Sequence, residues 1–307
     1  MNVDILCRRW GGPDGGWNGM AVAVAYFAFV LAEMGHTVRG YAMPSYGPTW
    51  THPRIEWHGK HDLSRSDSWP DLTITTVSYL WPQTVRSALA AGARDRLVYW
   101  HHHPVMPPGQ GALLASPPAV EPTNGWARHV ILPPSSWAAD SPGECTGDAV
   151  FVSSASPAKG GPLACEIARL CPDLRWYVLP GRASPDHLAA WRALPHVELA
   201  AGPLPHLALL DRARVVLSPT RSEVHPLLLV EAAVRGVPIV CTDLPGCRAA
   251  ASAASFVQRD APAEVWAAAL REALARPQER LVLPPYREVV ERALGELRPA
   301  GAAEACA

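Results

Sequence analysis

The sequence predicts an α/β protein built from two doubly wound domains in tandem. The chain has 307 residues, enough for two domains of about 150 residues each. Short runs rich in β-formers alternate with longer helical runs, which is the rhythm of βαβ units in a parallel sheet. A stretch rich in Pro, Gly and Ser, 103–147, interrupts this alternation before it restarts. We therefore expect an N-terminal domain over 1–140, a second domain over 148–280, and a C-terminal helix and tail over 281–307.

In the first domain, the run VDILC predicts a buried strand, and a glycine-rich loop leads from it into a helix. This helix spans about residues 20–34, because Gly35 suits a helix C-cap. Further strands are expected at the runs HTVRGYA, PDLTITTVS, RLVYW and HVILPPS, with a helix near 82–92.

The second domain repeats the alternation. Strands are expected over 149–154, 175–181, 197–202, 214–220, 237–243 and 255–259. Helices are expected over 160–171, 184–193, 204–213, 226–236 and 262–276, with a further helix over 283–298. Ligands of such sheets bind beyond the carboxyl ends of the strands, so two domains facing each other would enclose a cleft.

The composition disfavours several classes of partner and location. Apolar residues make up 49% and charged residues 18%, and the net charge is −1, so no surface that coats nucleic acid or membrane is expected. The longest apolar stretch, 21–32, is shorter than the about 20 residues of a membrane span. The N-terminus lacks the pattern of a signal peptide, and the seven cysteines contain no CxxC pair. We expect a cytoplasmic protein with no bound metal.

Two glutamates eight positions apart mark the stretch SEVHPLLLVEAAVRGVPIVCTDLPG. Pro226 suits the first turn of a helix, which leaves Glu223 in the preceding loop and places Glu231 about 7.5 Å along the helix axis. A helix N-terminus binds anions through its free amides. A phosphate there would have a carboxylate on each side to accept hydrogen bonds from sugar hydroxyls. The alternative is an amphipathic helix with two unrelated carboxylates.

This stretch resembles the E-x7-E segment of retaining glycosyltransferases of the GT-B fold, the group called glycosyltransferase family 4. The resemblance implies two Rossmann-like domains facing a cleft, with Glu223 at the transferred sugar and Glu231 on the ribose hydroxyls of the nucleotide. It also implies that the amides of Leu227 and Leu228 hold the diphosphate. Pro226 stands where the family commonly has glycine, which removes one amide donor.

The first domain carries a second part of the resemblance. The run GGPDGGWNGMAVAVAYFAFVLAEMGHTV is similar to the family's N-terminal glycine loop and helix. Glycines let a backbone approach a ligand closely, and Gly15 and Gly16 are the candidates here. The alternative is a turn that only reverses the chain. The loop contains no G-x-G-x-x-G, which disfavours a nicotinamide-dependent dehydrogenase.

The run SSASPAKGG follows the first strand of the second domain, where the family has GR…KG. Lys159 matches the phosphate-binding lysine, and a cation there would stabilise the charge that a diphosphate gains as the sugar departs. Ser153 or Ser154 occupies the place of the family's arginine, which Arg182 or Arg221 could replace. The alternative is an exposed lysine with no such role.

Three adjacent histidines end the strand run RLVYW in the first domain. Family members often carry a functional histidine at the end of this strand, near the donor sugar; His101 fits best and His102 is second. Neighbours on an extended chain point to opposite sides, so His101, His102 and His103 are not expected to share one metal ion. Structural or solvent-facing roles are the alternative.

The resemblance thus implies a retaining glycosyltransferase that needs no metal or cofactor, with Glu223, Lys159 and His101 as catalytic residues. The donor would be a nucleotide-diphosphate sugar, with UDP expected first and GDP next. A small soluble acceptor, such as a natural product or a sugar, fits a chain without a basic patch for lipid or DNA. Two alternatives remain, a GT-B nucleotide-sugar epimerase and a non-catalytic protein that binds a nucleotide sugar.

Overall fold

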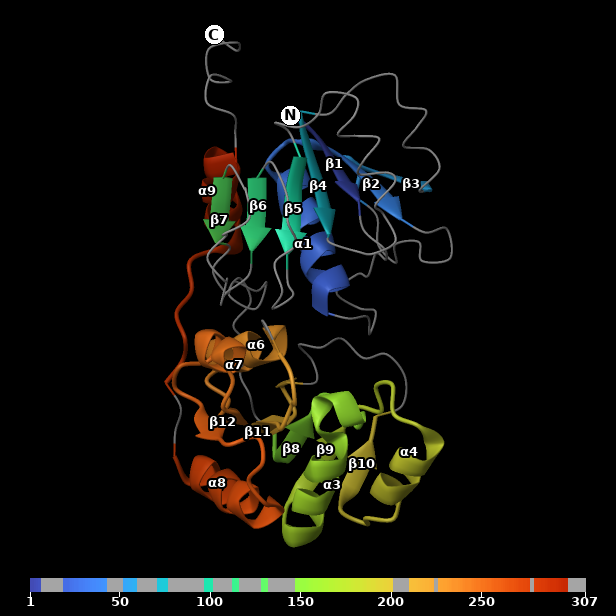
Figure 1. The fold of residues 1–307 in the computed structure, drawn as a ribbon, viewed down its shortest axis with the longest axis vertical. Coiled ribbons are helices and arrows are strands. Elements are labelled where there is room, and N and C mark those ends of the chain that lie inside the picture. The colour runs from blue at the N-terminus through green and yellow to red at the C-terminus, as the bar shows by residue number, and fades with distance from the viewer. Residues whose placement is uncertain are drawn as a thin grey trace. The chain divides into compact units, whose positions relative to one another are not determined.

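The computed structural model divides the chain into two compact units. Unit 1 comprises Met1–Pro133 together with Pro285–Ala307, and unit 2 comprises Pro134–Pro284 (Figure 1). The residues that the structure describes are 1–6, 19–42, 52–59, 71–76, 97–101, 112–115, 128–131, 147–200, 210–223, 226–276 and 279–297.

Unit 1 is built on a parallel sheet with the strand order β3-β2-β1-β4-β5-β6-β7. Strand β1 pairs with β2 on one side and β4 on the other, so the sheet winds outward in both directions from it. The described helices of the unit are α1 (Gly19–Glu33) and α9 (Tyr286–Leu297). The strands are β1 (Asn2–Leu6), β2 (Thr37–Ala42), β3 (Ile55–Gly59), β4 (Leu72–Thr76), β5 (Leu97–His101), β6 (Ala112–Ala115) and β7 (Arg128–Ile131).

One face of this sheet forms an apolar core with α1 and α9. Val3 and Ile5 on β1 are fully buried in it, together with Phe27 on α1 and Val290 on α9. Figure 1 shows α9, in red, beside β7 of unit 1. Helix α9 therefore completes the core of unit 1, although unit 2 separates this helix from the rest of unit 1 in the sequence.

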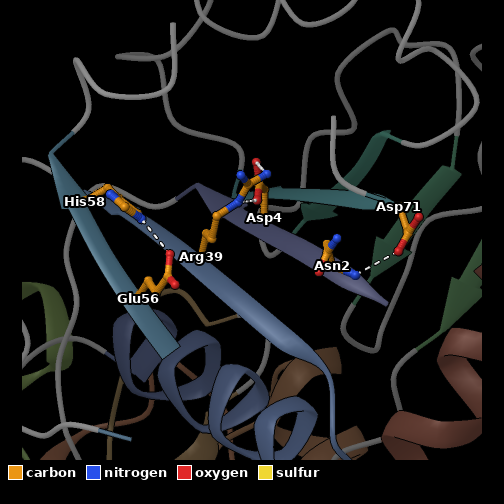
Figure 2. Close-up of polar contacts among 6 residues, drawn as sticks. All are labelled: Asn2, Asp4, Arg39, Glu56, His58 and Asp71. Carbon is orange, nitrogen blue, oxygen red and sulfur yellow. Dashed lines mark hydrogen bonds and ion pairs between the residues drawn. The ribbon is translucent and has the colours of Figure 1, made fainter. Parts of the chain in front are cut away.

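The opposite face of the same strands carries polar side chains, because successive residues of a strand point to opposite sides. The Arg39 guanidinium donates to both carboxylate oxygens of Asp4, at 2.7 and 3.2 Å (Figure 2). Burial raises the pKa of Asp4, and the hydrogen bond from Arg39 opposes that rise. On β3, the His58 ring lies 3.4 Å from Glu56 and stacks on Tyr41. The carboxylate of Asp4, in the run VDILC, is thus buried as the partner of Arg39 on the neighbouring strand β2.

Unit 2 is built on a second parallel sheet with the order β10-β9-β8-β11-β12-β13. Strand β8 holds the central position that β1 holds in unit 1, between β9 and β11. The strands are β8 (Ala149–Val152), β9 (Arg175–Val178), β10 (Val197–Leu199), β11 (Ala213–Ser218), β12 (Ile239–Thr242) and β13 (Ser255–Val257). The described helices are η5 (Pro157–Lys159), α3 (Gly161–Leu170), α4 (Pro185–Arg192), α6 (Leu227–Arg235), α7 (Pro245–Ala250) and α8 (Ala263–Ala275).

Helices cover both faces of the second sheet, so β8 is apolar on both sides. Val150 and Val152 belong to the core with α3 and α8, which also buries Trp266. Ala149 and Phe151 belong to the core with α6 and α7. The predicted doubly wound α/β architecture is therefore confirmed.

Most predicted elements agree with the structure within a few residues, and four elements were missed. The stretch 103–147 contains β6 as well as the expected β7; the run ALLA has no β-branched residue and gives no strand signal. β3 was missed because IEWHG is short and carries polar residues, and α7 because it begins with Pro-Gly. The single turn η5 was also unforeseen. The helix expected near 82–92, and most of the one expected over 204–213, lie outside the described residues.

Two loops at the carboxyl end of the second sheet pack closely against each other. Gly160, at the end of η5, has φ +75°, and a Cβ there would lie 1.9 Å from the carbonyl oxygen of Pro219. Pro219 follows β11, so the loop after β8 touches the loop after β11. Only glycine allows this backbone conformation and this approach without strain.

Helix α6 carries a buried carboxyl group, that of Glu231. Glu231 is 1% exposed, and its neighbour one turn along, Arg235, is 5% exposed. Arg235 Nε lies 3.4 Å from Asp211 Oδ1, but neither atom has a hydrogen-bond partner among the described residues. Burial raises the pKa of Glu231 to about 7, although Arg235 pulls it down. The carboxyl is thus close to half-protonated at neutral pH.

We predict that Gly160→Ala destabilises unit 2 by more than the roughly 1–2 kcal/mol that positive φ alone costs an L residue, because the Pro219 backbone must also move. Gly181→Ala is the matched control in the same unit. It also has positive φ, but its Cβ would meet the Ser154 hydroxyl, which can rotate. Chemical denaturation of both variants checks this, and an equal loss in the two would contradict it.

We also predict a pH-dependent effect of Glu231→Gln on stability. The folded protein holds a proton on Glu231 up to pH about 7, whereas the unfolded chain releases it near its ordinary pKa of 4.5. Wild-type stability therefore falls as pH rises between these values. The variant lacks this loss, so its stability relative to wild type should rise by about 2–3 kcal/mol from pH 5 to pH 8. Denaturant unfolding at the two pH values measures it; a constant difference would argue against a buried titrating carboxyl.

Candidate functional site

The loops that follow β8 and β11 bring a lysine and a glutamate together. Lys159 Nζ forms a hydrogen-bonded ion pair with Glu223 Oε2, across 64 positions of the sequence. The lysine side chain is 44% exposed and the glutamate side chain 19%, so the pair lies at the surface with the carboxylate more enclosed. Both residues lie beyond the carboxyl ends of parallel strands, where ligands of such sheets bind. The structure therefore joins the two predicted catalytic residues of the second domain.

A compact turn holds Lys159 in place. The carbonyl of Ser156 accepts hydrogen bonds from the amides of Lys159 and Gly161, at 3.1 and 2.9 Å. The Ser154 hydroxyl donates to the Ser156 hydroxyl at 2.9 Å and accepts from the Ser156 amide at 3.2 Å. The amide of Ala155 is tied to the end of β9 through Leu179, at 2.8 Å. The lysine therefore extends from a fixed backbone.

Two buried threonines fix the loop that carries Glu223. The Thr242 hydroxyl, at the end of β12, donates to the carbonyl of Thr220 at 2.7 Å. The Thr220 hydroxyl donates in turn to the carbonyl of Ser222 at 3.1 Å. Both threonine side chains are buried, and the loop is thereby tied to the neighbouring strand. The sequence places these threonines in strands and loops, but only the structure shows which carbonyl groups accept hydrogen bonds from their hydroxyls.

The N-terminus of α6 presents two amides. The helix begins at Leu227 with Pro226 as its N-cap, and proline offers no side-chain acceptor for the first turn. The amides of Leu229 and Val230 donate to the Pro226 carbonyl, at 2.9 and 3.4 Å. No hydrogen bond links the amides of Leu227 and Leu228 to another described residue. These are the donors predicted to hold a diphosphate, and they are of the kind that anions bind at helix ends.

Glu231 lies on the same helix, in its second turn, and is enclosed rather than exposed. Its Oε2 atom is buried and has no hydrogen-bond partner within the described part of the chain. A buried carboxyl oxygen without a partner is costly, so such atoms call for an explanation in ligand or water binding. The predicted ribose contact remains a prediction for this side chain.

The candidate residues of the first domain are less fully described. His101 is the last residue of β5, and its backbone pairs with Ala115 of β6. This agrees with the predicted position at a strand end. Gly15, Gly16, His102 and His103 lie outside the described residues.

A second polar cluster beyond the end of β12 was not foreseen. Arg248 of α7 donates to both oxygens of Asp243, at 2.5 and 2.8 Å, and Gln258 donates to the same carboxylate at 3.0 Å. The Arg248 guanidinium also lies over the Phe256 ring, 4.5 Å from its centroid. The five-residue spacing in DLPGCR could have suggested the Asp–Arg pair once α7 was recognised. The cluster fixes the strand end next to the Glu223 loop.

The arrangement at the carboxyl end of the second sheet combines a cation, a carboxylate and helix amides. A lysine and unpaired amides can bind and stabilise an anionic group, and a carboxylate can accept from hydroxyls. Among the described residues, no group of three or more His, Cys, Asp or Glu side chains is placed to hold a metal ion. Across the same ranges, no helix combines the length and apolar character that crossing a membrane requires.

Part of the chain matches a known protein family. Residues 149–276 match the protein family described as glycosyl transferases group 1. No curated protein matches the sequence.

Solved structures match over nearly the whole chain. AviGT4, a glycosyltransferase involved in avilamycin A biosynthesis, is 18% identical over 97% of each chain, with a TM-score of 0.62. Sucrose-phosphate synthase from Thermosynechococcus elongatus is 14% identical over 95% of this chain and 94% of its own, with a TM-score of 0.63. WaaG, a glycosyltransferase involved in lipopolysaccharide biosynthesis, is 15% identical over 97% and 96%, with a TM-score of 0.59.

These likenesses establish the fold. The two parallel sheets match those of GT-B glycosyltransferase structures, so the predicted GT-B fold is confirmed. The family match over the second sheet and its helices, taken with this fold, supports a glycosyltransferase.

Proposed function

We propose that this protein is a retaining, metal-independent glycosyltransferase. It moves a sugar from a nucleotide-diphosphate sugar, with UDP the first expectation and GDP the next, to a small soluble acceptor in the cytoplasm. The observation that carries the proposal is the Lys159–Glu223 pair at the ends of β8 and β11. Both residues lie in the unit that contains the family match, and Glu223 lies in the segment that precedes α6.

Each residue of this site has a role in the proposal. Lys159 and the amides of Leu227 and Leu228 bind the diphosphate, whose charge increases as the sugar departs. Glu223 accepts hydrogen bonds from the transferred sugar, and Glu231 accepts them from the ribose. The buried Oε2 atom of Glu231 has no hydrogen-bond partner among the described residues, which supports this role, because a hydroxyl donor would satisfy it.

In the proposed reaction, the bond between the sugar's anomeric carbon and the diphosphate oxygen breaks. The acceptor hydroxyl attacks the same face of the sugar, and its proton passes to the departing phosphate oxygen. No protein base and no metal ion are then required. The roles that the resemblance assigns to His101, in contact with the donor sugar, and to Gly15 and Gly16, in ligand binding, are part of this proposal.

The acceptor class rests on two observations. The net charge of −1 does not favour an anionic lipid or nucleic acid as the acceptor. One structural neighbour is involved in the biosynthesis of avilamycin A, which supports a natural product as one candidate acceptor.

We predict that one nucleoside diphosphate among UDP, GDP, ADP and dTDP binds the purified protein with micromolar affinity, and that EDTA leaves the affinity unchanged. Isothermal titration calorimetry measures both, with CMP as the monophosphate control. Incubation with the matching nucleotide sugars then separates the alternatives. Transfer or slow donor hydrolysis supports the proposal, conversion to another nucleotide sugar identifies an epimerase, and binding without turnover identifies a non-catalytic protein.

Glu223→Gln and Lys159→Ala should each lower kcat at least about 100-fold, because each removes a contact that strengthens in the transition state. Glu166→Gln on the exposed face of α3 is the control and should retain wild-type turnover. Steady-state kinetics with the identified donor measures the three variants. Wild-type-like turnover in both site variants would show that the chemistry lies elsewhere.

A further inference from the structure

The charge at the candidate donor site is largely balanced within the protein. Lys159 is the cation that extends from the loop after β8, and Glu223 is its ion-pair partner. A diphosphate carries at least two negative charges, and two helix amides offer only partial positive charge. If the proposed function holds, further cations are needed to hold the diphosphate.

Several arginines of unit 2 are already engaged in ion pairs. Those paired with carboxylates among the described residues are Arg175, Arg212, Arg235, Arg248, Arg271 and Arg276. Among the other arginines, Arg182, Arg221 and Arg259 are distinguished by position: they are exposed and follow the carboxyl ends of β9, β11 and β13. No ion pair or hydrogen bond joins these three to the rest of the described chain. Three unpaired arginines therefore lie along the edge of the sheet where ligands bind.

Arg221 extends from a part of this edge that hydrogen bonds hold in place. It lies between Thr220 and Ser222, whose hydrogen bond closes a turn, and Thr242 ties that turn to β12. It is also two residues before Glu223. An exposed guanidinium on an immobilised backbone, next to a predicted substrate contact, is arranged to meet a ligand with little loss of backbone entropy.

Arg182 occupies the corresponding place on the other side of the Lys159 loop. It follows Gly181, whose φ of +59° starts a turn closed by a hydrogen bond from the Ala183 amide to the Pro180 carbonyl at 3.2 Å. A Cβ at Gly181 would lie 2.2 Å from Ser154 Oγ, so this turn packs on the loop that leads to Lys159.

The strand order places both arginines beside the lysine. β9 and β11 flank β8, and neighbouring strands lie about 4.8 Å apart, so the ends of β9 and β11 are separated by roughly 10 Å. The Lys159 loop rises between them. Arg259 follows β13, two strands beyond β11, and is farther from this centre.

We propose that Arg182 and Arg221 bind the diphosphate of the donor from either side of Lys159. Their planar guanidinium groups can each donate two hydrogen bonds to phosphate oxygens. They would also stabilise the leaving group when the sugar–oxygen bond breaks, while Lys159 can keep its contact with Glu223. The inference rests on the proposed donor site.

Binding of inorganic pyrophosphate tests the inference without a nucleotide or turnover. Calorimetry on the full chain compares wild type with Arg182→Gln, Arg221→Gln and the double variant. Each single change should weaken pyrophosphate binding at least about 10-fold, the effect of losing one charge-assisted hydrogen bond. The double variant should lose more. Arg259→Gln is the matched control, with an unpaired arginine on the same edge, and should bind as wild type does.

The outcomes separate this inference from the proposed function. The inference is overturned if none of the substitutions weakens pyrophosphate binding, or if all three single substitutions weaken it equally. This holds even if donor turnover is found. If only one of Arg182→Gln and Arg221→Gln weakens pyrophosphate binding, the two-sided arrangement is wrong. It is also wrong if the wild-type protein does not bind pyrophosphate. A loss at Arg182 and Arg221 in a protein that binds no nucleotide supports the anion site and counts against the glycosyltransferase. Circular dichroism confirms that these exposed changes leave the fold intact.

Discussion

The pairing of β8 with β11 is the constraint on which the site of the second unit depends. The chain lays β9 and β10 on one side of β8 and then crosses to the other side for β11. Loops that leave the sheet at this reversal diverge, and a ligand site can form between them. The backbones of Gly160 and Pro219 lie in close contact, which keeps the loop after β8 near the loop after β11. Lys159 and Glu223 can therefore meet although they are distant in sequence.

A second constraint comes from the helix that follows. α6 must cover the sheet with an apolar face, and it does so with Leu229, Val230 and Ala232. Glu231 interrupts this face with a buried carboxyl group whose Oε2 atom has no hydrogen-bond partner in the described part of the chain. An apolar residue would suit the core better, since an unsatisfied buried polar group costs free energy. Proteins tolerate such conflicts mainly where function requires them. The buried carboxyl of Glu231 is therefore a stronger indication of a functional site than its apolar neighbours are.

The sequence was most informative where local pattern and fold coincide. The strands of unit 2 are short apolar runs bounded by turn residues, and all of those predicted are present. The sequence also assigned Lys159 and Glu223 to one donor site, but their direct contact depends on the pairing of β8 with β11, which it did not predict. Local pattern could not reveal the Asp211–Arg235 pair or the enclosure of Glu231, which depend on how α6 docks. It also missed β6, whose four residues pair only because β5 and β7 lie on either side.

The position of α9 has a consequence for the order in which the protein can fold during synthesis. Unit 1 buries Val290, Leu294 and Leu297 of this helix in its core, yet they follow the whole of unit 2 in the chain. The core of unit 1 therefore cannot be completed until α9 has been synthesised, whereas unit 2 is continuous and can close earlier. Domains commonly fold from the N-terminus onward as they are made. Here the unit that comes second in the chain can mature first, and part of the apolar face of unit 1 stays uncovered until α9 has been made.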